Sequence, residues 1–426
     1  MISQVVFILI LVSGIYFFTK NVRKIRRNIL LGKSYNPGTQ FGDRLKNMCL
    51  MALGQRKMFD RPISAFLHIL VYAGFILINI EVLEIFADGI LHSHRVFSGF
   101  FGNFYFLVIG FFELLALGVL VACVFFLIRR HIVRISRFNS KDLEGFPAKD
   151  ATIILVTEII MMCAVLIMNV CDVELQQKAQ LPVSTLFYGF ISNANESYIH
   201  IIERVAWWSH FVGIILFLNY VPFSKHFHII MAFPNTWYAN LLPKGKLENL
   251  ESVAQEVKLM LDPSASIPEG YIQPSSFGVK DIYDLSIKNL MDAYTCTECG
   301  RCTSVCPANI TGKKLSPRKI IMSVRDRLEE TGENIDKSGK EFKDNKSLHD
   351  YISAEELWAC NTCNACYEAC PVQINPMEII YKMRQYLIME KSEAPSEINI
   401  MFSNIENNGA PWQFSAMDRN NWASEI

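Results

Sequence analysis

The sequence reads CTECGRCTSVCP at residues 296–307 and CNTCNACYEACP at residues 360–371. Both stretches follow the pattern C-x2-C-x2-C-x3-C-P. Three thiolates with this spacing can hold three irons of one cubane, and the fourth, just before proline, reaches a second cubane. The repeated pattern therefore predicts two [4Fe–4S] clusters whose ligands cross between the motifs.

The crossed pattern assigns four cysteines to each cluster. The first cluster is predicted to take Cys296, Cys299, Cys302 and Cys370, and the second Cys360, Cys363, Cys366 and Cys306. Zinc is the rival metal, but zinc motifs usually pair two thiolates and add two more after a gap. The remaining four of the twelve cysteines are scattered, which is typical of core thiols.

Five apolar stretches are long enough to cross a bilayer, which takes about 20 residues of helix. They cover residues 3–19, 62–85, 100–128, 151–171 and 205–221. The first has no basic start and no small-residue cleavage site, so we expect a retained anchor and not a signal peptide. Residues 240–426 read as soluble sequence, so a membrane part followed by a soluble part is predicted.

Basic residues are unevenly distributed over the loops. Lysine and arginine crowd residues 20–61, and arginines follow the third span at positions 129, 130, 134 and 137. The opposite loops offer little beyond Arg95 and Lys178. The positive-inside rule then places the N-terminus outside and residues 222–426 in the cytoplasm, at the inner (cytoplasmic) membrane. Because the formal net charge is zero, no nucleic-acid partner is expected.

Four histidines lie at or inside the predicted spans: His68, His210, His226 and His228. An ionisable side chain at membrane depth is costly and usually functional. His210 and His228 are eighteen residues apart, which in one continuous helix makes five turns, or roughly 27 Å along one face. His68 is expected at the depth of His228, so a haem held by these two imidazoles is predicted. His226 would lie about 200° around from His228 and is the less favoured ligand. The alternative is interfacial histidines that bond headgroups or backbone carbonyls.

The stretch HFVGIILFLNYVPFSKHFH, residues 210–228, resembles the last span of the gamma subunit of respiratory nitrate reductase, a five-span dihaem cytochrome b. FLHI, residues 66–69, resembles the second-span ligand of the haem nearer the cytoplasm. That family has a further second-span histidine, a ligand of the outer haem, where this chain has Ile78. The resemblance therefore implies one haem b at His68 and His228. A second haem at His210 would need another partner, such as His94.

Residues 308–359 separate the two motifs and carry helical patterns such as 317–330, so the soluble part resembles an alpha-helical ferredoxin. The whole chain resembles membrane-bound heterodisulfide-reductase-like iron–sulfur oxidoreductases, some of which pass electrons from electron-transfer flavoprotein to menaquinone. Those proteins often continue into a cysteine-rich CCG region, whereas no CCG cysteines follow Cys370 here. The resemblance implies a separate CCG-domain iron–sulfur subunit, and residues 404–426 are expected to dock it.

These observations predict an all-α protein, a five-span transmembrane helix bundle followed by an alpha-helical ferredoxin domain with two [4Fe–4S] clusters. The expected divisions are a haem b membrane domain (1–232), a connector (233–280), the ferredoxin domain (281–393) and a partner-docking tail (394–426). The predicted function is a quinone-linked oxidoreductase subunit that relays electrons between a cytoplasmic redox partner and the menaquinone pool. The alternatives are a subunit of a heterodisulfide- or thiol-disulfide reductase fed by quinol, and a redox or haem sensor.

Three residues are candidates for a quinone site. Glu84 and His94 lie at or just beyond the outer end of the second span. Glu158, on the fourth span, is a candidate proton carrier for a site closer to the predicted haem. Carboxyl groups at membrane depth are costly unless they are partnered or solvated. A purely structural network at the outer surface is the alternative for the first two.

Overall fold

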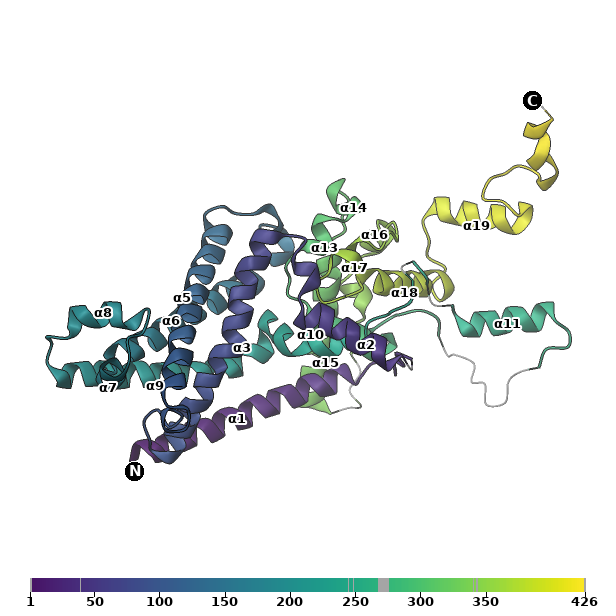
Figure 1. The fold of residues 1–426 in the computed structure, drawn as a ribbon. Helices are drawn as coiled ribbons and strands as arrows, with labels where there is room; N and C mark the ends of the chain where they lie inside the picture. The colour runs from purple at the N-terminus through teal and green to yellow at the C-terminus, as the bar shows by residue number, and fades with distance from the viewer. Residues whose placement is uncertain are drawn as a thin grey trace.

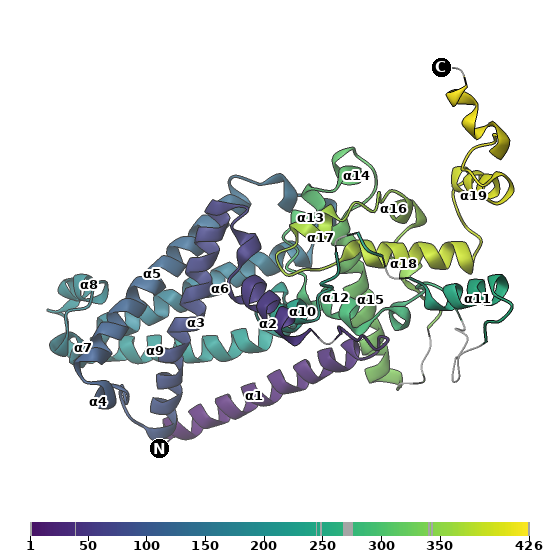
Figure 2. The same cartoon turned by 45° about the vertical axis from the view of Figure 1, so that its right-hand side comes forward.

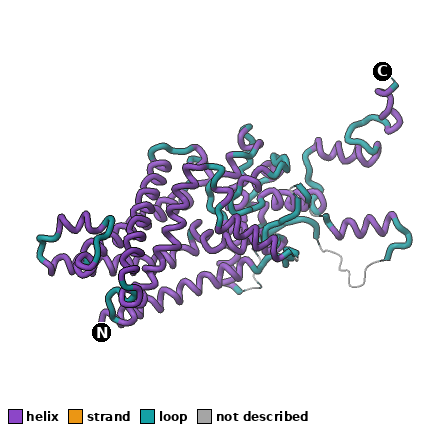
Figure 3. The backbone as a smooth tube through the Cα atoms, viewed as in Figure 1, coloured by secondary structure: helices purple, strands orange, loops and turns teal. Residues whose placement is uncertain are grey.

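The computed structural model of the chain describes residues 2–38, 40–243, 245–247, 249–266, 276–339, 341 and 344–424. Within these ranges the regular structure is helical, with no β-strand and one isolated β-bridge between Lys33 and Ser286. Figure 3 shows this as helices joined by loops from one end of the molecule to the other. The all-α prediction is confirmed.

Among the described residues, five helices are long and apolar enough to cross a membrane. They are α1 (Ile2–Ile29), α3 (Pro62–Leu91), α5 (Asn103–His131), α6 (Phe146–Cys171) and α9 (Glu196–Tyr220). The five predicted spans are thus confirmed as helices. The largest difference is in α1, which continues ten residues past its predicted end because its basic last turns pack against α12 and α15 of the soluble part.

The long helices pack as neighbours in the order α3, α5, α6 and α9, and α1 lies against α9 and α3. In Figures 1 and 2 these five helices occupy one end of the molecule and the soluble part the other. Phe7 of α1 stacks on Phe211 of α9, with ring centroids 4.0 Å apart. The ring also lies flat against Gly89 of α3, where a Cβ would come within 2.3 Å of it. Glycine is therefore needed there for α1 to approach α3.

Shorter helices connect the spans at both ends. At the end where the N-terminus lies, the connections are α4 (Ser98–Phe101), α7 (Val173–Lys178) and α8 (Ser184–Ile191) (Figure 2). At the other end they are α2 (Phe41–Met48), a π turn (Cys49–Leu53) and 3-10 turns (Arg56–Met58, Ser136–Phe138, Lys141–Leu143). The two basic loops therefore lie on the same side of the bundle as the soluble part, which is the relative placement that the charge pattern predicted.

The helix that carries His210 breaks before it reaches His228. α9 ends at Tyr220, two 3-10 turns follow (Val221–Phe223 and Lys225–Phe227), and α10 (His228–Trp237) begins at the second histidine. Pro222 has no amide hydrogen to continue the helix, and the Ser224 side chain accepts from the N–H of His226 to cap the next turn. The expectation that both histidines share one helix face was therefore wrong.

The soluble part is a cluster of short helices around one long one. These are α12 (Ile287–Thr295), α13 (Arg301–Ser304), α14 (Pro307–Ile310), α15 (Pro317–Ser338), α16 (Ala354–Trp358), α17 (Ala365–Ala369) and α18 (Pro376–Met389), with 3-10 turns at Ile282–Asp284 and Leu348–Asp350. Two further helices, α11 (Glu251–Leu261) and α19 (Ser396–Asn408), extend away from this cluster, and a 3-10 stretch (Ala416–Ala423) follows α19 (Figures 1 and 2).

One hydrophobic core joins the inner ends of the membrane helices to the soluble part. It includes Ile25 of α1, Phe217 of α9 and Met231 of α10 together with Leu290 of α12 and Ile320 of α15. α10 also crosses residue 232, where the membrane domain was expected to end. Because burial of apolar surface is the main stabilising force, the two parts behave as one packed body.

Candidate functional site

The two cysteine motifs fold into matching loops. Glu298 and Thr362, at the same place in each motif, have φ angles of 54° and 52°. Each donates its backbone N–H to the cysteine sulfur two residues earlier, at 3.4 Å. Gly300 and Asn364 follow with φ angles of 70° and 60° and begin α13 and α17. The sequence repeat is therefore also a structural repeat, with an amide hydrogen directed at a thiol in both copies.

Gly300 is required by its neighbours as well as by its φ angle. A Cβ at this position would lie 2.6 Å from a guanidinium nitrogen of Arg318 and 3.2 Å from the carbonyl oxygen of Arg137. Arg318 makes a two-pronged ion pair with Asp142, at 2.8 and 3.0 Å, and donates to the Arg137 carbonyl at 2.8 Å. The first motif is thus held tightly against the loop that follows α5.

Cysteines from the two motifs come together in two groups. A small cavity is lined by Cys296, Cys299, Cys302 and Cys370, and also by Cys366. Cys306 lies close enough to Cys360 and Cys366 for electrostatic interaction with both. None of the cysteines in the described part of the chain forms a disulfide. The last cysteine of each motif therefore lies beside the other motif, which is the placement that the crossed ligand sets require.

The chemistry of these thiols suits a polynuclear metal cluster. Burial, reinforced by neighbouring thiolates, raises the pKa of Cys366 to about 12 and that of Cys370 to about 11. Such thiols lose their protons when a metal binds. Around one zinc ion all sulfurs would lie about 2.3 Å from the metal. Nowhere in the described ranges do three His, Cys, Asp or Glu side chains lie close enough to hold a single ion.

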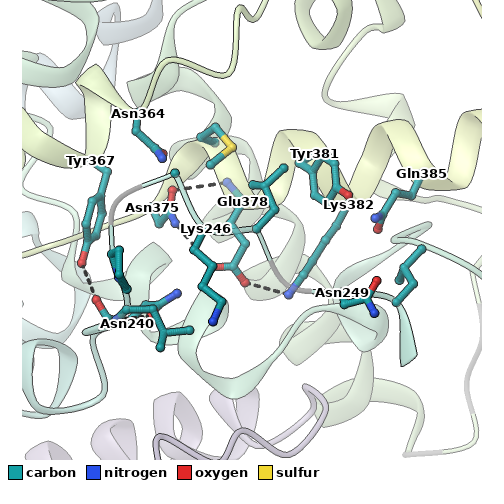
Figure 4. Close-up of a pocket in the computed structure, with 16 residues that line it drawn as sticks. Asn240, Lys246, Asn249, Asn364, Tyr367, Asn375, Glu378, Tyr381, Lys382 and Gln385 are labelled. Carbon is teal, nitrogen blue, oxygen red and sulfur yellow. Dashed lines mark hydrogen bonds and ion pairs between the residues drawn. The ribbon is translucent and has the colours of Figure 1, made fainter. Parts of the chain in front are cut away.

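The second motif is the more exposed of the two. Cys363 is exposed, whereas Cys296 and Cys306 are buried. Figure 4 shows a pocket beside this motif, lined by Asn364 and Tyr367 and by residues of α18. Its polar groups bond one another: the Tyr367 hydroxyl donates to the Asn240 carbonyl at 3.1 Å. Of the cysteines in the two motifs, Cys363 is therefore the one nearest to solvent.

Three histidines gather where the first motif meets the membrane helices. The rings of His226 and His228 have centroids 5.5 Å apart and are nearly perpendicular, at 86°. His68 lies close enough to both for electrostatic interaction. His226 is also flanked by the rings of Phe217 and Phe75, at 5.4 and 6.4 Å. Because the helix breaks before them, His226 and His228 share one group, and the angular argument against His226 fails.

Hydrogen bonds leave ring nitrogens of this group free to ligate. The Nδ1 of His228 lies 3.0 Å from the Lys225 carbonyl oxygen, which can only accept, so Nδ1 carries the proton and Nε2 a lone pair. The Nδ1 of His68 is buried and has no hydrogen-bond partner in the described part of the chain. Burial lowers the pKa of His228, and it lowers that of His226 to about 3. Neutral imidazoles with free nitrogens fit the axial ligands of a haem.

Arg301 lines the thiol cavity and is close enough to His68 for electrostatic interaction. It occupies a variable position of the first motif, is only 5% exposed, and donates to the Lys57 carbonyl at 2.8 Å. Its charge interacts with Cys299 and Cys370 on one side and with His68 on the other. The motif pattern leaves this position open, so the residue was not singled out from the sequence. Its interaction with both sets of predicted ligands makes it a candidate functional residue.

Glu158 and His210, which the sequence assigned to different sites, line one pocket inside the membrane bundle. His210 is buried, and its Nδ1 lies 3.1 Å from the Met161 carbonyl oxygen. Ile78, at the position where the resembling family has a histidine, lines the same pocket. The structure therefore brings together a carboxyl, an imidazole and an apolar residue where a second haem would need two imidazoles. These residues do not fit a bis-histidine haem.

Glu84 and His94 lie in a hydrogen-bonded network at the other end of the bundle. Glu84 accepts from the Tyr105 hydroxyl at 2.7 Å and from the backbone N–H of Phe97 at 2.9 Å. His94 Nε2 lies 3.1 Å from Asp172, and this hydrogen bond raises the pKa of His94. One oxygen of Glu84 thus holds the loop after α3 and the other holds α5, as the structural alternative expects.

Arg95 is the centre of that network, although the sequence marked it only as a loop charge. Its guanidinium donates to Asp172 at 2.7 Å, to Asn169 at 2.6 Å and to the Tyr105 hydroxyl at 3.0 Å. Glu81 lies 3.7 Å from it, and neither Glu81 oxygen has a hydrogen-bond partner in the part of the chain described. A buried cation thus binds two carboxylates, an amide and a hydroxyl contributed by α3, α5 and the end of α6, which stabilises this end of the bundle.

Comparison with known proteins agrees with this site. Residues 295–374 match the family model of the 4Fe-4S dicluster domain. The chain is 27% identical over 457 residues to a probable iron-sulfur-binding oxidoreductase of Bacillus subtilis, covering 99% of this chain and 61% of that protein. It is 24% identical over 458 residues to the EtfAB:quinone oxidoreductase of Syntrophomonas wolfei, covering 99% of this chain and 59% of that protein. The chain thus spans about three-fifths of the length of these two relatives.

A third relative, a heterodisulfide reductase-like protein of Archaeoglobus profundus, is 29% identical over 114 residues, which cover 26% of this chain and 46% of that one. No solved structure matches the chain significantly. The fold and the site define a helical membrane protein with a C-terminal 4Fe-4S dicluster domain. More particularly, it is similar to the heterodisulfide-reductase-like iron–sulfur oxidoreductases, and this resemblance, predicted from the sequence, is confirmed.

Proposed function

We propose that this protein is a membrane electron relay between a soluble redox partner and the menaquinone pool. Two [4Fe–4S] clusters and one haem b would each supply one-electron transfer. The cysteine sets Cys296/299/302/370 and Cys360/363/366/306 would hold the clusters, and His68 and His228 the haem, with His226 as the other candidate. Similarity to an EtfAB:quinone oxidoreductase over nearly the whole chain supports the quinone as acceptor.

One observation supports this proposal above the others: the thiols and the histidines belong to one packed body. The core that contains Cys296 and Cys306 also contains Phe217, whose ring lies 5.4 Å from that of His226, and Phe227, which lies between His226 and His228 in the sequence. Arg301 interacts with residues of both groups. Electron tunnelling needs short and fixed separations, and a packed core fixes them.

The exposure of the cysteines suggests the order in which the proposed centres would pass electrons. Cys363 of the second set is exposed, so a soluble partner would exchange electrons there. The first set adjoins Arg301, whose charge also acts on His68. The chain's own residues thus form a sequence from the solvent edge, through the buried first motif, to the histidines at the membrane helices.

The soluble part is proposed to lie in the cytoplasm, with the N-terminus outside, because the two basic loops lie on its side of the bundle. Two partners are proposed, electron-transfer flavoprotein and a CCG-domain iron–sulfur subunit. The first is suggested by the name of one relative, the EtfAB:quinone oxidoreductase, in which Etf abbreviates electron-transfer flavoprotein. The proposed divisions remain a membrane domain (1–232), a connector (233–280), a ferredoxin domain (281–393) and a docking tail (394–426).

A second candidate function is a quinol-fed component of a heterodisulfide- or thiol-disulfide-reductase-like complex. Several heterodisulfide reductase proteins resemble this chain, but each match covers only about a quarter of it. The two relatives that match 99% of the chain are named as oxidoreductases without a disulfide substrate. That difference favours the relay to quinone.

The proposal is tested with the purified chain in lipid vesicles that contain menaquinone. A low-potential one-electron donor is added outside, and quinone reduction is followed for wild type, Cys306→Ser and the matched control Cys123→Ser, whose thiol lies in the membrane core. We expect about eight irons per chain, loss of the second cluster and of quinone reduction in Cys306→Ser, and normal behaviour of Cys123→Ser. Equal activity in both variants, or zinc in place of iron, would refute the relay.

A further inference from the structure

A pocket of about 130 Å³ lies within the membrane bundle, between α3, α5, α6, α9 and α10. Its walls are mainly apolar and include Ile78, Val119 and Phe217. Glu158 and His210 are its two ionisable residues. The pocket therefore offers a ligand an apolar surface with two ionisable groups and the amide of Asn79 set into it, which is the usual composition of a specific small-molecule site.

His210 is oriented so that one nitrogen needs a partner. The ring is 1% exposed, and its Nδ1 donates to the Met161 carbonyl oxygen at 3.1 Å, because a carbonyl can only accept. Nε2 therefore carries a lone pair, and it is buried without a hydrogen-bond partner among the described residues. A buried unsatisfied nitrogen is costly. Its partner must be either a metal or a group with an O–H or N–H to donate.

The metal alternative lacks its second ligand. A bis-imidazole haem at this depth needs a histidine across from His210, and this chain has Ile78 there. His68, His226 and His228 already form their own group, and the Nε2 of His94, the partner considered from the sequence, lies 3.1 Å from Asp172. A hydrogen-bond donor on an organic ligand is therefore the partner that Nε2 fits.

Glu158 supplies the second polar group. It lies three residues before Met161 on α6, so it is about one turn from the carbonyl that holds His210. Its side chain is buried and has no hydrogen-bond or ion-pair partner in the described ranges. A carboxyl at membrane depth without a protein partner indicates that a ligand provides one.

We propose that this pocket binds the ring of a quinol, with one hydroxyl donating to His210 Nε2, the other oxygen bonded to Glu158, and the apolar tail along the pocket walls. The proposal rests on the proposed function, since it names the site at which the relay would bind the quinone. A phospholipid would fill the apolar walls but has no hydroxyl ring to satisfy both groups. Phe217, which lines the pocket, also contacts His226, so the pocket adjoins the histidine group.

The test measures binding of a short-chain menaquinol analogue to the full-length protein in detergent by calorimetry, under reducing conditions. Glu158→Gln and His210→Gln are each expected to weaken binding at least tenfold while iron, sulfide and haem contents stay unchanged. The matched controls are Glu144→Gln and His200→Gln, which are exposed and should bind as wild type does. Ile78→His, which fills the pocket with an imidazole, should also abolish binding.

Unchanged affinity in both Glu158→Gln and His210→Gln would overturn the site, as would wild-type binding by Ile78→His. A second haem in the wild-type chain that disappears in His210→Gln would overturn it too. Failure of the relay itself is a separate result: the clusters would not reduce the haem, whether or not the analogue binds. Thermal unfolding of each variant distinguishes a lost contact from a misfolded chain.

Discussion

The side-chain amide of Asn235 donates to the backbone carbonyl of Val372 over 2.9 Å, in the buried interior. Asn235 lies on α10, which begins at His228, and Val372 lies two residues after Cys370. One short helix thus spans from a predicted haem ligand to the loop of a predicted cluster ligand. This hydrogen bond is a direct tie between the membrane part and the soluble part.

Removal of the Asn235–Val372 hydrogen bond should weaken the packing between the membrane part and the soluble part. Asn235→Ala leaves a buried carbonyl unpaired, which costs about 1–3 kcal/mol of unfolding free energy. We expect a lower thermal unfolding midpoint and slower electron transfer from clusters to haem, with all cofactors retained. The control is Asn407→Ala on α19, whose amide bonds Ser403 one turn earlier on the same helix. Equal transfer rates in wild type and Asn235→Ala would show that the tie does not set the separation.

Loss of either predicted haem ligand should remove the haem. His68→Ala and His228→Ala are each expected to abolish the low-spin bis-imidazole absorption spectrum, since one iron needs both axial nitrogens. His226→Ala should shift the spectrum and retain the haem, because its ring adjoins that of His228. His131→Ala, at the exposed end of α5, is the control. A normal spectrum in His68→Ala would mean that another residue ligates the iron.

Acid should weaken the contact between the first motif and the loop after α5. Burial raises the pKa of Asp142, but hydrogen bonds from Arg318 outweigh it and hold that pKa below its usual value. The group therefore contributes stability that is fully present above its unfolded pKa, about 3.9, and that is lost as the pH falls through the lower folded pKa. Asp142→Asn should lower the unfolding midpoint at neutral pH and match wild type in acid.

The control for this pH series is Asp43→Asn, whose carboxylate is exposed at the same side of the bundle. It should leave the unfolding midpoint unchanged across the series. A difference between Asp142→Asn and wild type that stayed constant from neutral to acid pH would contradict the assigned role of the ion pair.

The C-terminal tail should hold a partner. Trp412 and Trp422 are 56% and 67% exposed, so they do not pack back on the ferredoxin domain. Large exposed aromatics often anchor interfaces. Deletion of residues 404–426 is expected to release a co-expressed CCG-type subunit in affinity purification, with iron content unchanged. Trp412→Ala with Trp422→Ala in the full-length chain should give the same release. Retention of the partner by both proteins would refute the docking role.

Much of this site could be predicted from local spacing. The cysteine motif places its ligands within one loop and one helical turn, and the structure shows both copies with matching φ angles at Glu298 and Thr362. The five spans were predictable from apolar length for the same reason, since each is a property of consecutive residues. The ligand roles themselves stay predictions.

Long-range contacts were not predictable in this way. The prediction that His210 and His228 share one helix face assumed a continuous helix. In the structure the helix ends before Pro222, and the Ser224 side chain caps the next turn. Arg95 and Arg301 looked like ordinary basic residues because their partners come from distant segments. Glu158 and His210 could be placed in one pocket only after α6 and α9 were packed together.

The central claim is that electrons reach the haem through the thiol-bound clusters. Rapid mixing of the full-length protein with a one-electron donor, followed by absorbance, tests it directly. The account predicts that cluster bleaching precedes haem reduction in wild type, and that haem reduction slows at least tenfold in Cys306→Ser, which lacks the second cluster. Haem reduction at the wild-type rate in Cys306→Ser, with that cluster shown to be absent by iron analysis, would contradict the relay.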